Sequence, residues 1–153
     1  MILAAQAVPS AAFLPCIAAL PSGWTVVANS EIASGRATFL LQPGQAGLQP
    51  VRITLTATCD TVGAQQIPSP SGQPGMRRFD RRLTLVPEYS DVRYYIFPGG
   101  CATYQFVFAP GASPVLATTV ASAVAFMPRS QLVSYVQRTE NLALCGRGAT
   151  CPG

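Results

Sequence analysis

The chain has 153 residues, of which 49% are hydrophobic and 10% charged, and it contains neither histidine nor lysine. Without these side chains, a serine–histidine–acid triad, a serine–lysine dyad and a mixed cysteine–histidine zinc site are excluded. The net charge of +4 is too small for the basic stripe of a nucleic-acid-binding protein, and the length indicates a single domain.

The N-terminal segment, residues 1–15, has features of the end of an export signal. It is apolar, and the Ala-Gln-Ala triplet at 5–7 is of the small-x-small type that signal peptidase recognises. No arginine precedes Arg36, so the basic front of such a signal is missing. We predict a remnant of a signal or anchor-proximal segment over residues 1–15 and one globular domain over 16–153. The alternative is an apolar N-terminal segment that docks on the core.

Strands are predicted in the first half of the domain, after a possible short helix at 12–20. Residues 24–27 and 37–41 are rich in strand formers and flank a polar stretch, which predicts a hairpin with a longer loop. Residues 51–59 alternate strictly, with apolar residues at odd positions and polar ones at even positions. One face of this strand should therefore meet the core, and Cys59 should point inward.

A second group of strands should follow the proline-rich loop at 67–75, whose prolines lack the N–H donor that a ladder needs. Residues 76–86 predict one strand, and residues 92–108 predict a hairpin with a glycine-containing turn at 98–100. The residues expected to anchor the core are Trp24, Phe39, Tyr104, Phe106 and Phe108.

The C-terminal part changes to helical periodicity. Residues 115–127 are apolar but too short to cross a membrane, which predicts a core element. Pro128 suits the first turn of a helix that continues to Glu140, with Leu132 on its apolar side and Arg129 on the opposite side. We expect this amphipathic helix to lie on one face of the sheet.

Together these elements predict an α+β fold. It should consist of an antiparallel sheet of five to seven short strands with one or two helices packed on one face. An all-β sandwich is the alternative.

The cysteines favour an oxidising compartment, although reduced cysteines in a cytosolic domain are the alternative. No two of them form the Cys-x-x-Cys pair of a zinc ribbon or thiol oxidoreductase, and we expect no metal and no cofactor. Five choices of a free cysteine and three pairings of the other four allow fifteen patterns. We favour Cys59–Cys101 and Cys145–Cys151, which leaves Cys16 free.

The densest charge lies at residues 77–82, where Arg77, Arg78, Arg81 and Arg82 are candidate binding residues. Guanidinium groups suit carboxylates and phosphates, so the run is a candidate site for an anionic polymer or an acidic envelope protein. The alternative is a solvated edge strand whose charges prevent edge-to-edge aggregation.

Two stretches carry a resemblance: RYYIFPGGCATYQF at 93–106 and the ending LCGRGATCPG at 144–153. They resemble a group of uncharacterised actinobacterial envelope proteins, which carry an N-terminal signal or membrane anchor and one extracytoplasmic domain. The likeness covers most of the chain from Cys16 onward. It implies a secreted or membrane-anchored location and brings no known activity.

These observations predict a non-catalytic extracytoplasmic module of the cell envelope, for interaction or for structure. A subunit that self-associates is one alternative. The other is an acid-dependent hydrolase, which would use a carboxylate pair drawn from Glu88 and Asp91 or from Asp60 and Asp80.

Overall fold

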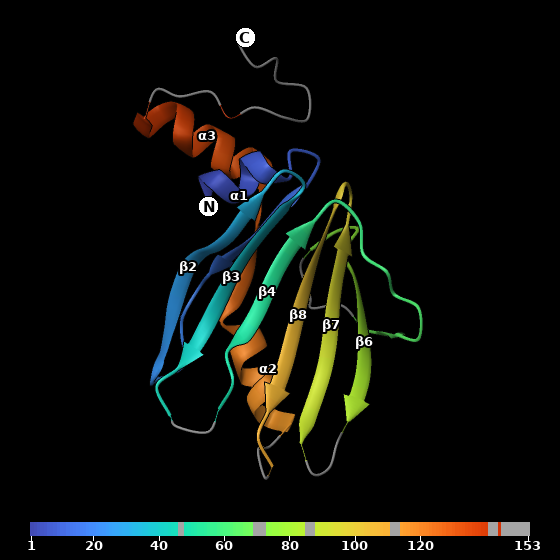
Figure 1. Ribbon diagram of the computed structural model, residues 1–153. Helices are drawn as coiled ribbons and strands as arrows, with labels where there is room; N and C mark the ends of the chain where they lie inside the picture. The colour runs from blue at the N-terminus through green and yellow to red at the C-terminus, as the bar shows by residue number, and fades with distance from the viewer. Residues whose placement is uncertain (46–47, 69–72, 85–87, 111–113, 141–143, 145–153) are drawn as a thin grey trace.

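The computed structural model describes residues 1–45, 48–68, 73–84, 88–110, 114–140 and 144, and it confirms the α+β fold (Figure 1). No helix in these ranges is both long and apolar enough to cross a membrane. In chain order the elements are α1 (Ile2–Ala7), β1 (Phe13–Ile17), β2 (Trp24–Ala33), β3 (Arg36–Pro43), β4 (Val51–Thr56), β5 (Gln65–Ile67), β6 (Arg77–Thr84), β7 (Tyr89–Phe97), β8 (Gly100–Phe108), α2 (Pro114–Ser122), β9 (Val124–Pro128) and α3 (Arg129–Glu140).

Seven strands form one antiparallel sheet in the order β2-β3-β4-β8-β7-β6-β5, at the upper end of the predicted range. The chain leaves the middle of the sheet after β4 and runs to the far edge at β5. It then returns through β6, β7 and β8 until β8 pairs with β4. Strands β1 and β9, far apart in the sequence, form a separate two-stranded antiparallel sheet.

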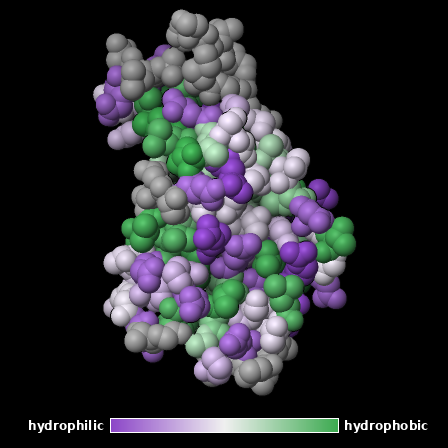
Figure 2. All heavy atoms as spheres, viewed as in Figure 1, coloured by the Kyte–Doolittle hydropathy of each residue, from purple (hydrophilic) through white to green (hydrophobic). Residues whose placement is uncertain are grey.

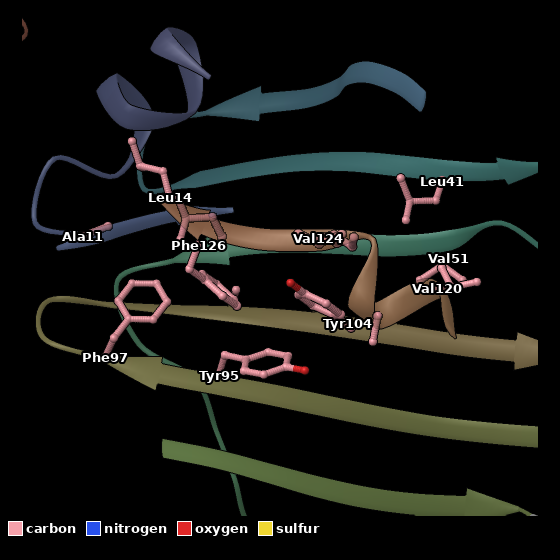
Figure 3. Packing of buried hydrophobic residues seen from close by; sticks show 14 of the residues in the cluster. Ala11, Leu14, Leu41, Val51, Tyr95, Phe97, Tyr104, Val120, Val124 and Phe126 are labelled. Carbon is pink, nitrogen blue, oxygen red and sulfur yellow. The ribbon is translucent and has the colours of Figure 1, made fainter. Parts of the chain in front are cut away.

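The main core lies between the large sheet and a layer formed by β1, β9 and α2, which lie behind the sheet in Figure 1. We call the sheet face toward this layer the inner face. As predicted, the side chains of Tyr104, Phe106 and Phe108 share this face and are fully buried. Phe126 of β9 packs against this face, with its ring centroid 5.0 Å from that of Tyr95 and 6.4 Å from that of Tyr104 (Figure 3). Trp24 and Phe39 also join this core.

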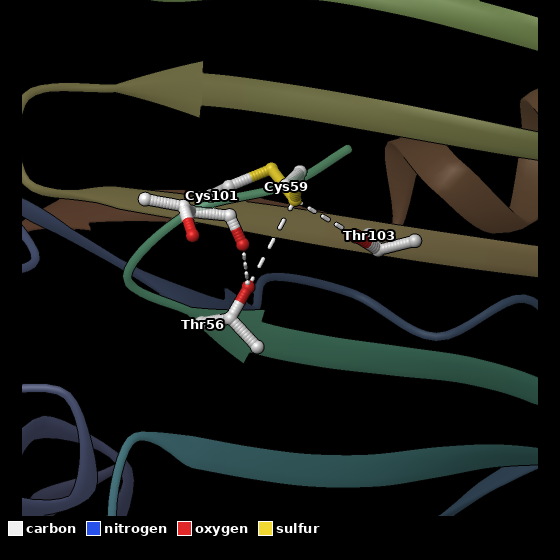
Figure 4. Close-up of a disulfide and its surroundings, with 5 residues drawn as sticks. Thr56, Cys59, Cys101 and Thr103 are labelled. Atoms are coloured by element: carbon white, nitrogen blue, oxygen red, sulfur yellow. Dashed lines mark hydrogen bonds between the residues drawn. A yellow bond between two sulfur atoms is a disulfide. The ribbon is translucent and has the colours of Figure 1, made fainter. Parts of the chain in front are cut away.

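The opposite, outer face carries a second and smaller core, in which Val92, Tyr94 and Cys101 are buried. Cys59 packs against this core, and its disulfide with Cys101 confirms one predicted bridge (Figure 4). The two Cα atoms are 5.9 Å apart, and Thr103 Oγ1 lies 3.1 Å from Cys59 Sγ. A bridge between residues 42 apart in sequence stabilises the fold by about 4 kcal/mol on the loop-entropy model.

The expected inward direction of Cys59 is wrong, because β4 ends at Thr56 and the alternation stops with it. Val51, Ile53 and Leu55 are buried as predicted, whereas Cys59 lies beyond the strand and joins the outer core. The proposed Cys145–Cys151 bridge lies outside the described residues. Figure 2, viewed as Figure 1, shows hydrophilic and hydrophobic side chains interspersed over the exposed sheet.

Two local predictions in the first half of the chain are also wrong. Residues 13–17 form β1 instead of a helix, because they pair with β9 along their whole length and bury Leu14 in the main core. The loop expected between β2 and β3 is strand as far as Ala33, with a shift of register between Val27 and Glu31. The hairpin turns tightly at Gly35, whose φ of +81° is in the region that favours glycine.

The segment at 1–15 contributes directly to the main core: Ala5, Val8 and Leu14 are at most 1% exposed. Whether this segment derives from an export signal stays a prediction. The apolar stretch at 115–127 divides into α2 and β9.

Helix α3 has nearly the predicted bounds but a different place. It lies beside α1 at one end of the sheet instead of across its face (Figure 1). Leu132 and Val136 are buried as expected. Arg129, expected on the polar side, is only 4% exposed because its Nη1 donates a hydrogen bond of 2.9 Å to the Ala5 carbonyl of α1.

Candidate binding site: an arginine-lined cavity on the inner face

Strand β6 divides the four arginines proposed from the sequence between the two faces of the sheet. Neighbouring residues of a strand point to opposite faces, and the register with β7 shows which face each takes. Arg77 and Arg81 share the outer face with Phe79. Arg78 and Arg82 share the inner face with Asp80. The basic run is therefore not one site.

The outer pair lies against aromatic rings. The Arg77 guanidinium carbon is 5.8 Å from the centroid of Phe79, and that of Arg81 is 5.6 Å from the centroid of Tyr94. Arg81 Nη1 also donates to the carbonyl of Val62 at 3.3 Å. These contacts stabilise the smaller core on the outer face. Arg81 covers the ring of Tyr94, which belongs to that core, and Arg77 covers the ring of Phe79, which packs against it.

Of the inner pair, Arg78 borders a cavity of about 390 Å³. Strands β6 and β7 form one side of this cavity, and α2 and β9 form the other. Arg93 of β7 borders the same cavity. The cavity has a charged wall of two arginines and an apolar wall, and polar groups stand at its margin. The remaining residues that matter for its chemistry are Gln73, Tyr95, Thr118, Ser122, Val124 and Phe126.

One carboxylate, Asp80, holds both cavity arginines. Arg78 donates to it twice, from Nε to Oδ1 at 3.0 Å and from Nη2 to Oδ2 at 2.5 Å. Hydrogen bonding to Asp80 raises the pKa of Arg78 above its usual value. Arg93 Nε lies 3.2 Å from Asp80 Oδ1, which makes an ion pair, but without the alignment of a hydrogen bond. Asp80 thus satisfies Arg78 much better than Arg93.

Arg93 is the most deeply placed cation of the cavity. It is 4% exposed, and its guanidinium carbon lies 5.5 Å from the centroid of the Phe106 ring. Its buried Nε has no hydrogen-bond acceptor among the described residues. A buried guanidinium nitrogen without an acceptor is unusual, because buried polar groups are nearly always hydrogen-bonded.

Next along β7 on the inner face, Asp91 is a buried carboxylate. It is 2% exposed and accepts a hydrogen bond of 3.1 Å from the Tyr89 hydroxyl on Oδ2, while its Oδ1 has no partner in the part of the chain that the structure describes. Desolvation raises the pKa of Asp91 above its usual value, and the pKa of Tyr89 rises to about 12, chiefly by desolvation and then through the charge of Asp91. Arg82 stands opposite Asp91 in the register.

In each carboxylate pair considered for hydrolysis, the two side chains differ in their surroundings. Glu88 is exposed whereas Asp91 is buried. Asp60 is exposed and accepts a hydrogen bond from the Val62 amide, whereas Asp80 is occupied by two arginines. Within the described ranges, no three Cys, Asp or Glu side chains gather in a way that could hold a metal ion.

Cys16 carries a free thiol, as the favoured pairing predicts. Its Sγ donates to the carbonyl of Ala125 in the neighbouring strand β9 at 3.5 Å. Desolvation raises the pKa of this thiol, which lowers the fraction of reactive thiolate.

The sequence prediction named Arg78 but missed Arg93. Arg93 did leave a signal, since it is the one basic residue of the strand YSDVRYYIF and four apolar or aromatic residues follow it directly. A charged residue in such a strand is a buried charge, which needs a partner or a function.

Searches of protein-family models, curated proteins and solved structures find no match to this chain.

Proposed function

We propose that this chain is a non-catalytic binding module of an extracytoplasmic compartment, and that its cavity holds an anionic group of an envelope component. The cavity arginines Arg78 and Arg93 would bind that group, with the hydroxyls of Thr118 and Ser122 at the margin. The outer arginines, Arg77 and Arg81, have no part in this site.

The observation that carries the proposal is the state of Arg93. A guanidinium carries five N–H donors, and that of Arg93 is buried with one imperfectly aligned carboxylate as its ion-pair partner among the residues described. Burial without full pairing costs free energy, which a ligand with two acceptor oxygens would recover. The position at the wall of a cavity gives such a ligand access.

Two further features support the compartment and the lack of catalysis. A disulfide such as Cys59–Cys101 persists mainly in oxidising compartments. The chain has no histidine and no lysine, which are the usual acid–base and amine catalysts near neutral pH.

Adjacent arginines on opposite faces provide a matched test. We would titrate acetate and inorganic phosphate into the protein and follow the Nε–H signals of arginine in proton–nitrogen correlation spectra. The signal of Arg93 should shift on binding of at least one of the two anions. Arg78→Gln should weaken the binding about tenfold, whereas Arg77→Gln should leave it unchanged, since a charge-assisted hydrogen bond contributes about 1.5–3 kcal/mol.

Equal effects of the two substitutions would place the anion on the surface and overturn the proposal, as would an Arg93 signal that neither anion moves. The compartment is tested separately by alkylating free thiols in intact cells before lysis. Cys59 and Cys101 should be protected from the reagent, and their modification would contradict an oxidising location.

A further inference from the structure

The cavity combines one net positive charge with an apolar wall. Arg78 and Arg93 contribute two positive charges, and Asp80 cancels one of them. Arg82 and Asp91, the next opposed pair on the same face, carry opposite charges that offset one another. The opposite wall is formed by Val124 and Phe126 of β9, which are at most 9% exposed. Tyr95 stands between the two walls, with its ring centroid 5.0 Å from that of Phe126.

The charge favours a monoanion over a dianion. A ligand with one negative charge would leave the site neutral, whereas a phosphate dianion would leave an uncompensated negative charge beside Asp80. An uncompensated charge in a largely desolvated place is costly. A planar carboxylate also matches the fork of a guanidinium, to which it can accept two parallel hydrogen bonds.

The apolar wall indicates what the rest of the ligand is like. A volume of about 390 Å³ lies near the lower end of the range for small-molecule sites, in which apolar and aromatic side chains line most of the surface and a few polar groups fix the orientation. An aromatic or aliphatic body would be buried against Tyr95, Val124 and Phe126, because apolar surface is driven out of water.

From these features we infer that the cavity binds a small monocarboxylate with an apolar body, whose carboxylate pairs with Arg93 while the body lies against Phe126. This inference rests on the proposed function, since it specifies which anion the same cavity takes.

Asp80 has a defined role in this arrangement. Its Oδ1 lies 3.2 Å from Arg93 Nε, so it occupies part of the space that an incoming carboxylate would use. The two negative charges would repel one another across Arg93. Asp80 is therefore an internal competitor of the ligand: it cancels one of the two arginine charges when the cavity is empty and opposes binding when the ligand enters.

The test compares three probes that share a phenyl ring and differ in the head group: benzoate, phenyl phosphate and neutral benzamide. At about pH 8 phenyl phosphate is mostly a dianion, because its second pKa is about 6. Binding is measured by calorimetry and by the shift of the Arg93 Nε–H signal. Benzoate should bind at least tenfold more tightly than phenyl phosphate, and benzamide should not bind.

Four variants separate the parts of the inference. Arg93→Gln should abolish benzoate binding, and Asp80→Asn should tighten it about tenfold. Ser122→Phe should block the cavity from the exposed side of α2 and should fold, since Ser122 is exposed. Arg77→Gln, on the outer face, should change nothing. Thermal unfolding of each variant, and a mass that shows the disulfide intact, confirm that it is folded.

The outcomes distinguish this inference from the proposed function. Tighter binding of phenyl phosphate than of benzoate would overturn the choice of a carboxylate and leave an anion site in place. Weaker binding by Asp80→Asn would overturn the role of Asp80 as competitor. Binding that survives Ser122→Phe would place the ligand elsewhere. A protein that binds neither anion, as wild type or as Asp80→Asn, would end both proposals.

Discussion

The inner face of the sheet has two halves that differ in kind. Over β3, β4 and β8 it is apolar, and side chains such as Leu41, Ile53 and Tyr104 are fully buried. Over β6 and β7 it carries Arg78 and Asp80, and then Arg93 and Asp91, at neighbouring positions. The two halves belong to one continuous sheet, so the difference arises from what covers each of them.

The covering layer explains the difference. Strand β9 places Phe126 over the border between the two halves, close to the rings of Tyr95 of β7 and Tyr104 of β8 (Figure 3). Beside the charged half the layer borders a cavity, with Thr118 and Ser122 at its margin. A fold that needed only stability would place apolar residues there as well, because well-packed hydrophobic residues often replace a buried ion pair without loss of stability. The charges at the cavity wall are therefore the feature on which the proposed binding function rests.

The largest effect is expected from breaking the apolar half. Phe126→Ala removes a ring that contacts Tyr95, Phe97 and Tyr104, and leaves a hole in the main core. The free energy of unfolding should fall by about 3–5 kcal/mol, as measured by urea denaturation. Val107→Ala, on the same sheet but 45% exposed, is the control and should change it by less than about 0.5 kcal/mol. Equal losses would show that β9 does not close the core.

The next effect concerns the charged half. Tyr89→Phe removes the one hydrogen bond that Asp91 accepts from a described side chain and leaves a buried carboxylate without it. We expect a loss of about 1–3 kcal/mol near neutral pH, the cost of an unsatisfied buried polar group. Tyr135→Phe, at a hydroxyl-bearing ring that is 55% exposed, is the matched control. No loss in Tyr89→Phe would mean that water reaches Asp91.

The apolar half was largely predictable from the sequence, because its signals are local. The alternation of Val51, Ile53 and Leu55, and the shared face of Tyr104 and Phe106, each follow from the period of two in a single strand. Such signals need no knowledge of what lies across the core. The Cys59–Cys101 bridge belonged to the pattern we favoured among fifteen, between which the spacing of the cysteines does not decide.

The covering layer and the cavity were not predictable, because they depend on contacts between distant segments. Strand β1 forms only because β9 pairs with it, and its Pro15 lowers strand propensity in any local reading. The periodicity of β6 does place Arg77 and Arg78 on opposite faces. It does not show that α2 and β9 border a cavity at Arg78, nor that Arg93 of β7 lies opposite Asp80 of β6 in the register.

The smallest effect is the pH dependence that Asp91 adds to the charged half. The groups that act on Asp91 are Tyr89, Asp80, Arg82 and Arg93. Desolvation by burial is a larger effect than that of any of these groups, and it raises the pKa of Asp91. The folded state therefore binds the proton more tightly than the unfolded state does. The stability from this group is complete below its unfolded pKa of about 4, and is lost as the pH rises through the raised, folded value.

Asp91→Asn removes this titration and keeps an acceptor for the Tyr89 hydroxyl. The free energy of unfolding of the wild type, minus that of Asp91→Asn, should therefore decrease as the pH rises from about 4. One group limits the slope to about 1.4 kcal/mol per pH unit. Urea denaturation at several pH values measures this difference, and the carboxylates common to both proteins cancel in it. If instead the difference grew with pH, the attraction of Arg82 and Arg93 would outweigh desolvation. Asp91 would then be a paired anion like Asp80, and the charged half of the inner face would stabilise the fold instead of costing it stability.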